Sequence, residues 1–198
     1  MQLHAPMRLV LLLLCALVLG GCGSYSFKGG TITPPEPAPD FTLTDHNGQP
    51  FRLSEQRGKV TLIFFGFTFC PDVCPTALAD MRNVRRELGD DAEQVQVLFV
   101  TVDPERDTPE RLKSYTSKFD PSFLGLYGTP EELAPVFKDY GVLATRRELP
   151  GSALKYTIDH TAFTFVIDKA GRWRLLFSHG APVDDMVSDL RYLVRENA

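Results

Sequence analysis

Apolar residues follow the spacing of β-strands in the first half of the chain. Residues 41–53 (FTLTDHNGQPFRL) alternate apolar and polar positions around Asn47 and Gly48, a pair that favours the tight turn of a hairpin. Residues 59–67 (KVTLIFFGF) and 94–103 (QVQVLFVTVD) are nearly continuous apolar runs. Such runs are typical of parallel strands that are buried on both faces.

Helical spacing follows each of these runs. After residue 75, apolar side chains recur at intervals of three and four, and Gly89 ends the pattern. Thr108 and Thr129 each precede a proline, as a capping residue precedes the first helical turn. Glu132 completes a capping box with Thr129. The sequence therefore predicts three helices between residues 75 and 140.

The C-terminal part predicts a second hairpin and a last helix. The apolar runs 161–168 and 172–178 flank a short turn, and Pro182 opens a helical pattern. A hairpin, then βαβ with parallel central strands, then ββα is the order of the thioredoxin fold with an N-terminal β-hairpin extension. We therefore expect an α/β domain over residues 40–198, with a central mixed sheet flanked by helices.

Two segments lack a regular period. Residues 23–39 are rich in glycine and proline, which is typical of a flexible tether. Residues 141–158 are expected to form a long irregular loop, and such loops in small domains are often functional.

The N-terminus has the pattern of a signal peptide. Residues 9–20 form an apolar run too short for a membrane-spanning helix, and they end in Leu19-Gly20-Gly21-Cys22, which resembles a bacterial lipobox. We expect residues 1–21 to be a lipoprotein signal peptide, Cys22 to carry lipid, and residues 22–39 to be a lipid-anchored tether. The protein would then be extracytoplasmic, on the periplasmic side of a membrane. An uncleaved anchor, or a chance cysteine after an ordinary signal, is the alternative.

Composition and charge limit the kinds of protein and partner that the sequence allows. With 43% hydrophobic residues in 198, the mature chain is large enough for one globular core. The net charge of −4 and the lack of basic clusters give no electrostatic reason to expect nucleic acid as a partner.

Only two of the cysteines lie in the predicted domain, and we expect them to be a functional pair. Of four cysteines, Cys15 lies in the signal core and Cys22 is the predicted lipid site, which leaves Cys70 and Cys74 in the domain. An oxidising compartment favours a disulfide between them. However, a loop of three residues restrains the unfolded chain little, so a purely structural disulfide is disfavoured.

The stretch Cys70-Pro-Asp-Val-Cys74-Pro follows a buried strand. Pro75 disfavours helical dihedrals at Cys74, so we expect the helix to begin at Pro75 with Cys74 as its N-cap. Both sulfurs would then lie near a helix N-terminus, which favours thiolate over thiol. Such a pair is a nucleophile and also a soft ligand for Cu(I), or for zinc with further ligands.

A third ligand for a metal would have to come from elsewhere in the chain. His46 falls at the tip of the first hairpin and is expected to be a solvated turn residue, and His179 ends a strand and is expected at the surface. His160 immediately precedes the predicted strand over residues 161–168. In the thioredoxin fold, the segment before this strand passes directly over the cysteines. Paired with the two cysteines, His160 is the favoured third ligand. A structural zinc site is disfavoured because no fourth donor is evident.

Three motifs together resemble the Sco/SenC family: CPDVCP, TVDPERDTPE over residues 101–110, and YTIDHT over residues 156–161. The resemblance implies a copper protein of thioredoxin fold, with one copper, Cu(I) or Cu(II), bound by Cys70, Cys74 and His160. It implies a metallochaperone that delivers copper to the dinuclear centre of cytochrome c oxidase subunit II. The further expected partners are a thioredoxin-like reductant of the Cys70–Cys74 disulfide and another copper chaperone.

Two carboxylates and one rival function complete the expectations. Asp103 ends a strand and Asp159 adjoins the histidine, so both are candidates to orient the metal ligands. Alternatively, the protein is a thiol–disulfide oxidoreductase that reduces the cysteines of the oxidase centre, with Cys70 and Cys74 as catalytic residues and His160 dispensable. A redox or copper sensor and a peroxidase are weaker alternatives.

Overall fold

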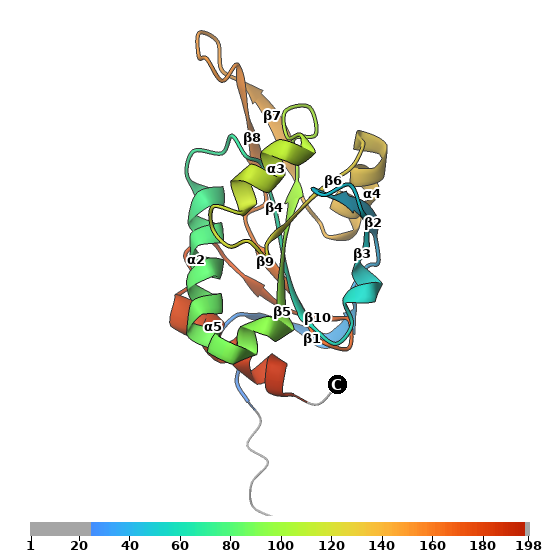
Figure 1. Ribbon diagram of the computed structural model, residues 1–198, viewed down its shortest axis with the longest axis vertical. Helices are drawn as coiled ribbons and strands as arrows, with labels where there is room; N and C mark the ends of the chain where they lie inside the picture. Colours follow the sequence, from blue (N-terminus) through green and yellow to red (C-terminus); the bar gives the residue numbers. More distant parts are fainter. Residues whose placement is uncertain (1–24, 197–198) are drawn as a thin grey trace, which may run out of the picture.

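The computed structural model describes residues 25–196 (Figure 1). The strands are β1 (Gly30–Pro37), β2 (Thr42–Asp45), β3 (Pro50–Arg52), β4 (Val60–Gly66), β5 (Val95–Thr101), β6 (Leu124–Tyr127), β7 (Ala144–Glu148), β8 (Tyr156–His160), β9 (Thr164–Ile167) and β10 (Arg172–Phe177). The α-helices are α2 (Val73–Leu88), α3 (Pro109–Thr116), α4 (Pro130–Asp139) and α5 (Val183–Arg195). Two short 3₁₀ helices follow β3 and α2.

One mixed sheet organises the described residues. Its strand order is β1-β10-β9-β4-β5-β6-β2-β3, with β4, β5 and β6 parallel and β9 antiparallel to β4. All residues of β4 are buried, as its continuous apolar run predicts. The predicted α/β thioredoxin-like class with a central mixed sheet and flanking helices is confirmed. The first hairpin, β2–β3, pairs at the far edge of the sheet.

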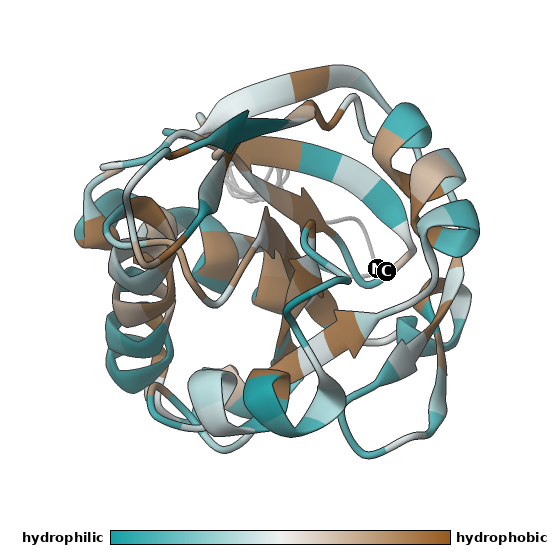
Figure 2. Ribbon diagram, turned by 90° about the horizontal axis from the view of Figure 1, so that it is seen from above, coloured by the Kyte–Doolittle hydropathy of each residue, from teal (hydrophilic) through white to brown (hydrophobic). Residues whose placement is uncertain are grey.

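Alternate side chains of β4 define the two faces of the sheet. The Phe65 ring packs edge-on against Phe137 of α4, with 6.0 Å between centroids, whereas Phe64 stacks toward Phe99 at 6.3 Å. Phe64 also lines a surface with Ala77 of α2, so α2 and α4 cover opposite faces. Figure 2 shows the resulting distribution, with apolar residues on the central strands and hydrophilic residues on the outer sides of the helices.

The predicted helix starts are confirmed at two sites. The Thr108 side chain accepts a hydrogen bond from the Arg111 N–H at the start of α3. Thr129 and Glu132 form a reciprocal capping box at the start of α4. These caps satisfy N–H groups that have no partner inside the helix.

The expected flexible tether is wrong for residues 25–39. Residues 30–37 form β1, which pairs antiparallel with β10 at the edge of the sheet. Proline is tolerated in an edge strand because one side of such a strand needs no hydrogen bonds, so a Pro-rich segment could pair here despite its composition.

The expected irregular loop over residues 141–158 is also wrong in part. Residues 144–148 (β7) and 156–160 (β8) pair antiparallel as a separate two-stranded hairpin, which projects at the top of Figure 1. Four of the five β7 residues are polar or charged, and all five are exposed, so no apolar alternation marked the strand in the sequence.

The predicted signal peptide (residues 1–21) and the lipid site Cys22 lie outside the described residues. Within residues 25–196, no helix combines the length and apolar character needed to cross a membrane.

Candidate metal centre

The two cysteines lie where β4 gives way to α2. Cys70 precedes the helix, and Cys74 is its second residue. The expectation that Cys74 is the N-cap is wrong: Asp72 holds that position and Pro75 lies within the first turn. A proline there costs no intrahelical bond, because the first N–H groups of a helix have no intrahelical partner. The Cys74 N–H instead donates to the Cys70 sulfur at 3.4 Å.

A buried carboxylate fixes the loop that leads to the cysteines. Asp107 accepts hydrogen bonds from the backbone N–H of Thr68, at 3.1 Å, and from the Thr68 hydroxyl, at 2.6 Å. The Thr101 hydroxyl at the end of β5 donates to the same carboxylate at 2.8 Å. Burial raises the pKa of Asp107. The loop after β4 is therefore tied to the loop after β5, at the carboxyl edge of the sheet.

Gly66 makes room for the Cys74 side chain. A Cβ atom at residue 66 would lie 2.8 Å from the Cys74 sulfur and 2.8 Å from the Phe99 ring. Cys74 itself is fully buried. Sequence reasoning missed Gly66, although a glycine at the end of a buried strand often marks a close approach of another group.

His160, the last residue of β8, reaches the cysteines from the opposite side. Its Nε2 lies 3.4 Å from the Cys74 sulfur, and its Nδ1 lies 3.0 Å from the Thr161 carbonyl oxygen. A carbonyl oxygen only accepts, so Nδ1 carries the proton and the Nε2 lone pair faces the sulfur. The rings of Phe64 and Phe67 meet the imidazole edge-on, at 6.1 and 5.7 Å.

The three donor atoms form a cluster that fits a metal ion. The sulfurs of Cys70 and Cys74 and a ring nitrogen of His160 all lie within 4.8 Å of one another. Sulfur and imidazole donors lie about 2.0–2.3 Å from a bound zinc ion, which allows at most about 4.6 Å between two donors of one such ion. The cluster thus needs only small shifts to close on an ion. Two thiolates and an imidazole are soft donors of the kind that select Cu(I).

The two thiols differ in acidity. A hydrogen bond with Cys74 is the main factor that lowers the pKa of Cys70 to about 4, and backbone N–H groups add to this effect. The same hydrogen bond, with burial, raises the pKa of Cys74. Without metal, the reduced site therefore holds a thiolate at the half-buried Cys70 and a thiol at the buried Cys74. Both cysteines are free in the described chain.

Asp103 acts on this site through Tyr156 and not by direct contact. The Tyr156 hydroxyl donates to the buried carboxylate of Asp103 at 2.8 Å, and burial together with this bond raises the pKa of Tyr156 to about 12. Arg106 donates from Nε to Asp103 at 2.5 Å and from a terminal nitrogen to the Tyr156 carbonyl oxygen at 3.1 Å. Tyr156 lies four residues before His160 in β8, so this network fixes the strand that carries the histidine.

The Tyr156 ring also lies between two guanidinium groups. The Arg106 guanidinium carbon lies 3.6 Å from the ring centroid and that of Arg146 lies 3.7 Å from it. Arg146 also pairs with Glu105 at 3.0 Å. These contacts join the β7–β8 hairpin to the loop after β5. The motifs over residues 101–110 and 156–161, which the sequence analysis treated separately, are thus one structural unit.

The expected role of Asp159 is not supported. Its exposed carboxylate pairs with Arg147 on β7, at 2.9 and 3.2 Å, which lowers the pKa of Asp159. Successive residues of a strand point to opposite faces, so a residue adjacent to His160 in sequence points away from it. The Arg147 pair orients the hairpin surface and not the imidazole.

The other two histidines of the described chain lie apart from the cluster. His179 is exposed, as expected. His46 differs from a freely solvated turn residue, because its Nδ1 accepts a hydrogen bond from the Gly125 N–H at 3.0 Å. Burial lowers the pKa of His46. It therefore joins the first hairpin to β6.

A shallow hollow of about 290 Å³ gives access to the cluster. Cys70 and His160 both line it, together with Phe67, Pro71 and Ile158. Its wall includes both the cysteine loop and β8, so an approaching group would meet Cys70 before the fully buried Cys74.

The fold and site together define a thioredoxin-like protein with a Cys-Cys-His metal centre. The chain belongs to the SCO1/SenC family, whose model matches residues 30–195. This finding confirms the resemblance of the three sequence motifs.

Curated relatives and solved structures agree with this assignment. The SCO2-like protein RP587 of Rickettsia prowazekii (strain Madrid E) is 41% identical over 133 residues, which cover 67% of this chain and 65% of that protein. The chain thus spans slightly less than two thirds of the length of that relative. Bradyrhizobium japonicum ScoI with copper bound is 42% identical with a TM-score of 0.72, covering 79% of this chain and 99% of that structure. Apo Sco1 of Thermus thermophilus is 44% identical with a TM-score of 0.76, covering 87% and 99%.

Proposed function

We propose that the protein is a copper metallochaperone. It holds one copper ion with Cys70, Cys74 and His160 and delivers the ion to the dinuclear copper centre of cytochrome c oxidase subunit II during assembly. The observation that carries the proposal is the cluster of two sulfurs and an unprotonated imidazole nitrogen within 4.8 Å. The copper-bound ScoI structure of Bradyrhizobium japonicum supports the choice of metal.

Transfer would proceed by exchange of ligands one at a time. Cys70 and His160 line the open hollow, so a thiolate of the recipient can approach the copper from that side while the buried Cys74 still holds it. Three-coordinate intermediates shared between donor and recipient then avoid a free ion. The hollow is also the natural place for contact with the recipient or with a second copper chaperone.

The proposed location is the extracytoplasmic side of a membrane, with lipid on Cys22. The lipobox-like sequence before Cys22 supports this location. In that oxidising compartment Cys70 and Cys74 would form a disulfide in the absence of copper, so a thioredoxin-like partner is needed to reduce them.

Copper titration with a histidine variant tests the chaperone proposal. The reduced protein, free of oxygen, is expected to bind one copper per chain. His160→Ala removes one of three ligands and is expected to weaken binding by orders of magnitude. His179→Ala is the matched control, because that side chain is exposed and lies outside the cluster. The second step is to mix the loaded protein with copper-free subunit II, to separate the two proteins, and to measure the copper bound to each.

The difference in acidity between the cysteines favours a second candidate, a thiol–disulfide oxidoreductase. The Cys70 thiolate would attack a disulfide of the oxidase centre and form a mixed disulfide, releasing one target thiolate. Cys74, after loss of its proton, would then attack the Cys70 sulfur and release the second target thiolate. The target gains two electrons and this protein becomes a disulfide. Rapid reduction of an oxidase-derived disulfide peptide by His160→Ala, together with copper binding indifferent to that substitution, would favour this function.

A further inference from the structure

The first described residues are fixed firmly to α5. The fully buried carboxylate of Asp189 accepts hydrogen bonds from the backbone N–H groups of Lys28, at 2.9 Å, and Gly29, at 2.8 Å. The Tyr25 hydroxyl donates to the same carboxylate at 2.9 Å and lies 2.8 Å from the Ser188 hydroxyl. Because a buried carboxylate without these donors would be costly, this part of the chain is held in place.

Aromatic packing adds to this attachment. The rings of Tyr25 and Tyr192 stack at 4.1 Å with an angle of 11° between their planes. Phe27 packs edge-on against both, at 5.1 Å from Tyr25 and 5.4 Å from Tyr192. The domain therefore extends at least to Tyr25, and the boundary near residue 40 predicted from the glycine and proline content is wrong.

This early start leaves little length between the domain and the predicted lipid site. Only Gly23 and Ser24 separate Cys22 from Tyr25. Three Cα–Cα steps span at most about 11 Å, so the Tyr25 Cα lies within that distance of the Cys22 Cα. If Cys22 carries lipid in a bilayer, the side of the domain that bears Tyr25 must lie against the bilayer surface.

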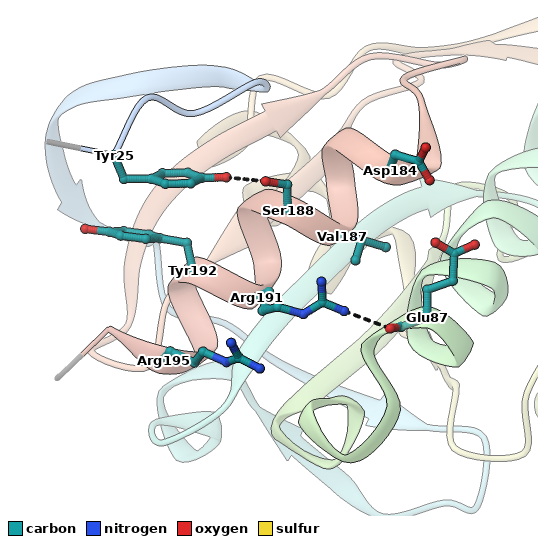
Figure 3. Close-up of a pocket in the computed structure, with 8 residues that line it drawn as sticks. All are labelled: Tyr25, Glu87, Asp184, Val187, Ser188, Arg191, Tyr192 and Arg195. Atoms are coloured by element: carbon teal, nitrogen blue, oxygen red, sulfur yellow. Dashed lines mark hydrogen bonds between the residues drawn. The ribbon is translucent and has the colours of Figure 1, made fainter. Parts of the chain in front are cut away.

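That side carries a groove of about 510 Å³ between α5 and the end of α2 (Figure 3). Arg191 and Arg195 lie along it, one helical turn apart, and the Tyr25–Tyr192 pair forms one wall. Arg191 donates to the Glu87 carbonyl oxygen at 2.8 Å, and Arg195 pairs with Asp91 at 3.0 Å. The Arg195 side chain remains 67% exposed, so it still presents N–H groups to solvent.

The groove combines groups that suit a zwitterionic phospholipid headgroup. Arginine presents several N–H donors to a phosphate, and tyrosine is enriched at membrane interfaces because its ring is apolar and its hydroxyl polar. The carboxylates of Glu87 and Asp184 line the same groove and can face an amine. A phosphoethanolamine headgroup carries both partners, a phosphate and an ammonium.

We propose that the Arg191–Arg195 groove and the Tyr25–Tyr192 pair form a membrane-contact surface that rests on the phospholipid headgroups of the bilayer holding the Cys22 lipid. The proposal rests on the lipid attachment at Cys22 proposed above. The short link brings this face to the bilayer, and the groove contacts hold it there.

The surface fixes which way the metal cluster faces. Glu87 lies at the end of α2 that borders the groove, and Cys74 lies thirteen residues earlier, near the other end. At 1.5 Å per residue, about 20 Å of helix axis separates them. In Figure 1, α5 accordingly lies in the lower part of the molecule, whereas the β7–β8 hairpin projects at the top. The cluster is therefore presented away from the membrane, toward a partner that projects from it.

The test uses the full-length lipidated protein in phosphatidylethanolamine nanodiscs that contain a lipid with a gadolinium-chelating headgroup. Mass spectrometry first establishes the lipid on Cys22. Paramagnetic broadening of backbone amide signals then maps the distance of each residue from the bilayer. Amides at the end of α2 and in residues 187–195 are expected to be broadened severalfold more than those of residues 70–74 and 156–160.

A spacer distinguishes two causes of the orientation: binding of headgroups by the groove, and the short link between Cys22 and Tyr25. Twelve Gly and Ser residues inserted between Ser24 and Tyr25 free the domain from the length constraint. The broadening pattern is expected to persist with this spacer and to become uniform when Arg191→Glu and Arg195→Glu are added. The control pair Arg82→Glu and Lys118→Glu makes the same change of charge at exposed positions outside the groove and is expected to leave the pattern intact.

Two results would overturn the proposal. Uniform broadening in the spacer variant with both arginines present would mean that the groove does not bind headgroups. Absence of lipid on Cys22 would remove the length constraint on which the surface was assigned. Neither result affects copper binding by Cys70, Cys74 and His160, so the metallochaperone proposal stands or falls separately.

Discussion

The Tyr156 hydroxyl donates a hydrogen bond of 2.8 Å to the buried carboxylate of Asp103, and this contact joins the hairpin that carries His160 to the body of the sheet. The β7–β8 hairpin pairs with no strand of the main sheet. Its position relative to the cysteines therefore depends on side-chain contacts such as this one. Arg106 strengthens the junction by binding both residues.

Tyr156→Phe is expected to weaken copper binding about 10-fold with little change in the rest of the fold. Loss of an outer hydrogen-bonding partner of a metal site typically costs about 10–100-fold in affinity. The lower end is expected here, because the ring and its contacts with Arg106 and Arg146 remain. Competition with a Cu(I) chelator measures the affinity.

Tyr127→Phe is the matched control for this change. Tyr127 ends β6, and its hydroxyl has no hydrogen bond within residues 25–196. Affinity should be unchanged in that variant. Equal losses in both variants would show that the phenol group of Tyr156 has no particular part in placing His160.

The two carboxylates nominated from the sequence should behave differently. Asp103→Asn is expected to lower copper affinity, because it replaces the charged acceptor of both Arg106 and Tyr156 in a buried setting. Asp159→Asn is expected to leave affinity unchanged, since its carboxylate is exposed and paired with Arg147. Copper competition and thermal unfolding of both variants test this. A greater loss of affinity in Asp159→Asn would contradict the assigned geometry.

Sequence spacing predicted the centre better than its surroundings. Cys70 and Cys74 could be found because they follow the continuous apolar run of β4, and His160 because it precedes the apolar run over residues 161–168. Asp159 was nominated for its adjacency to His160, but the two-residue period of β8 places neighbouring side chains on opposite faces. Gly66 was missed because its role depends on a sulfur eight residues later, which no local pattern reveals.

The predicted start of the domain near residue 40 was wrong for a related reason, because the contacts that fix the preceding residues are distant in sequence. The carboxylate that fixes Lys28 and Gly29 belongs to Asp189, about 160 residues away along the chain. Local composition describes only intrinsic preference, and a Pro-rich segment reads as a linker unless its distant partner is known. The strand β1 is defined by its antiparallel pairing with β10, which the local sequence of residues 30–37 does not indicate.

Alkylation should distinguish the two cysteines by pH. With a pKa of about 4, Cys70 is expected to react with iodoacetamide at a nearly constant rate from about pH 9 down to pH 5 and to lose reactivity below that. Cys74 should react slowly throughout, because it is buried and its pKa is raised. Mass spectrometry of the reduced, metal-free protein at each pH gives both rates.

The sign of the pH effect on stability follows from the same shift. The folded state favours the Cys70 thiolate, so the contribution of this thiolate to the free energy of unfolding is fully present above the ordinary thiol pKa of 9.0. It is lost as the pH falls toward about 4.

In Cys74→Ala the main hydrogen bond to Cys70 is absent, and the pKa of Cys70 should rise toward its ordinary value. Preferential labelling of Cys74 in the unmodified protein would contradict this assignment.

Gly66→Ala is expected to destabilise the fold and to disturb the copper centre together. The added methyl group would lie 2.8 Å from the Cys74 sulfur, 2.8 Å from Phe99 and 2.9 Å from Phe64, so buried groups must move. Overpacking of this kind costs about 1–3 kcal/mol in the free energy of unfolding. Displacement of the Cys74 sulfur should also lower copper affinity. Chemical denaturation and Cu(I) competition measure the two effects.

Gly30→Ala provides the comparison within the same sheet. A Cβ atom at residue 30 would meet only the Leu176 carbonyl oxygen at 3.5 Å, an ordinary contact in an exposed part of β1. Its stability and copper affinity should match those of the unmodified protein. If Gly66→Ala retained full copper affinity despite a lower free energy of unfolding, the close approach of residue 66 would serve core packing alone, and the position of the Cys74 sulfur would not depend on it.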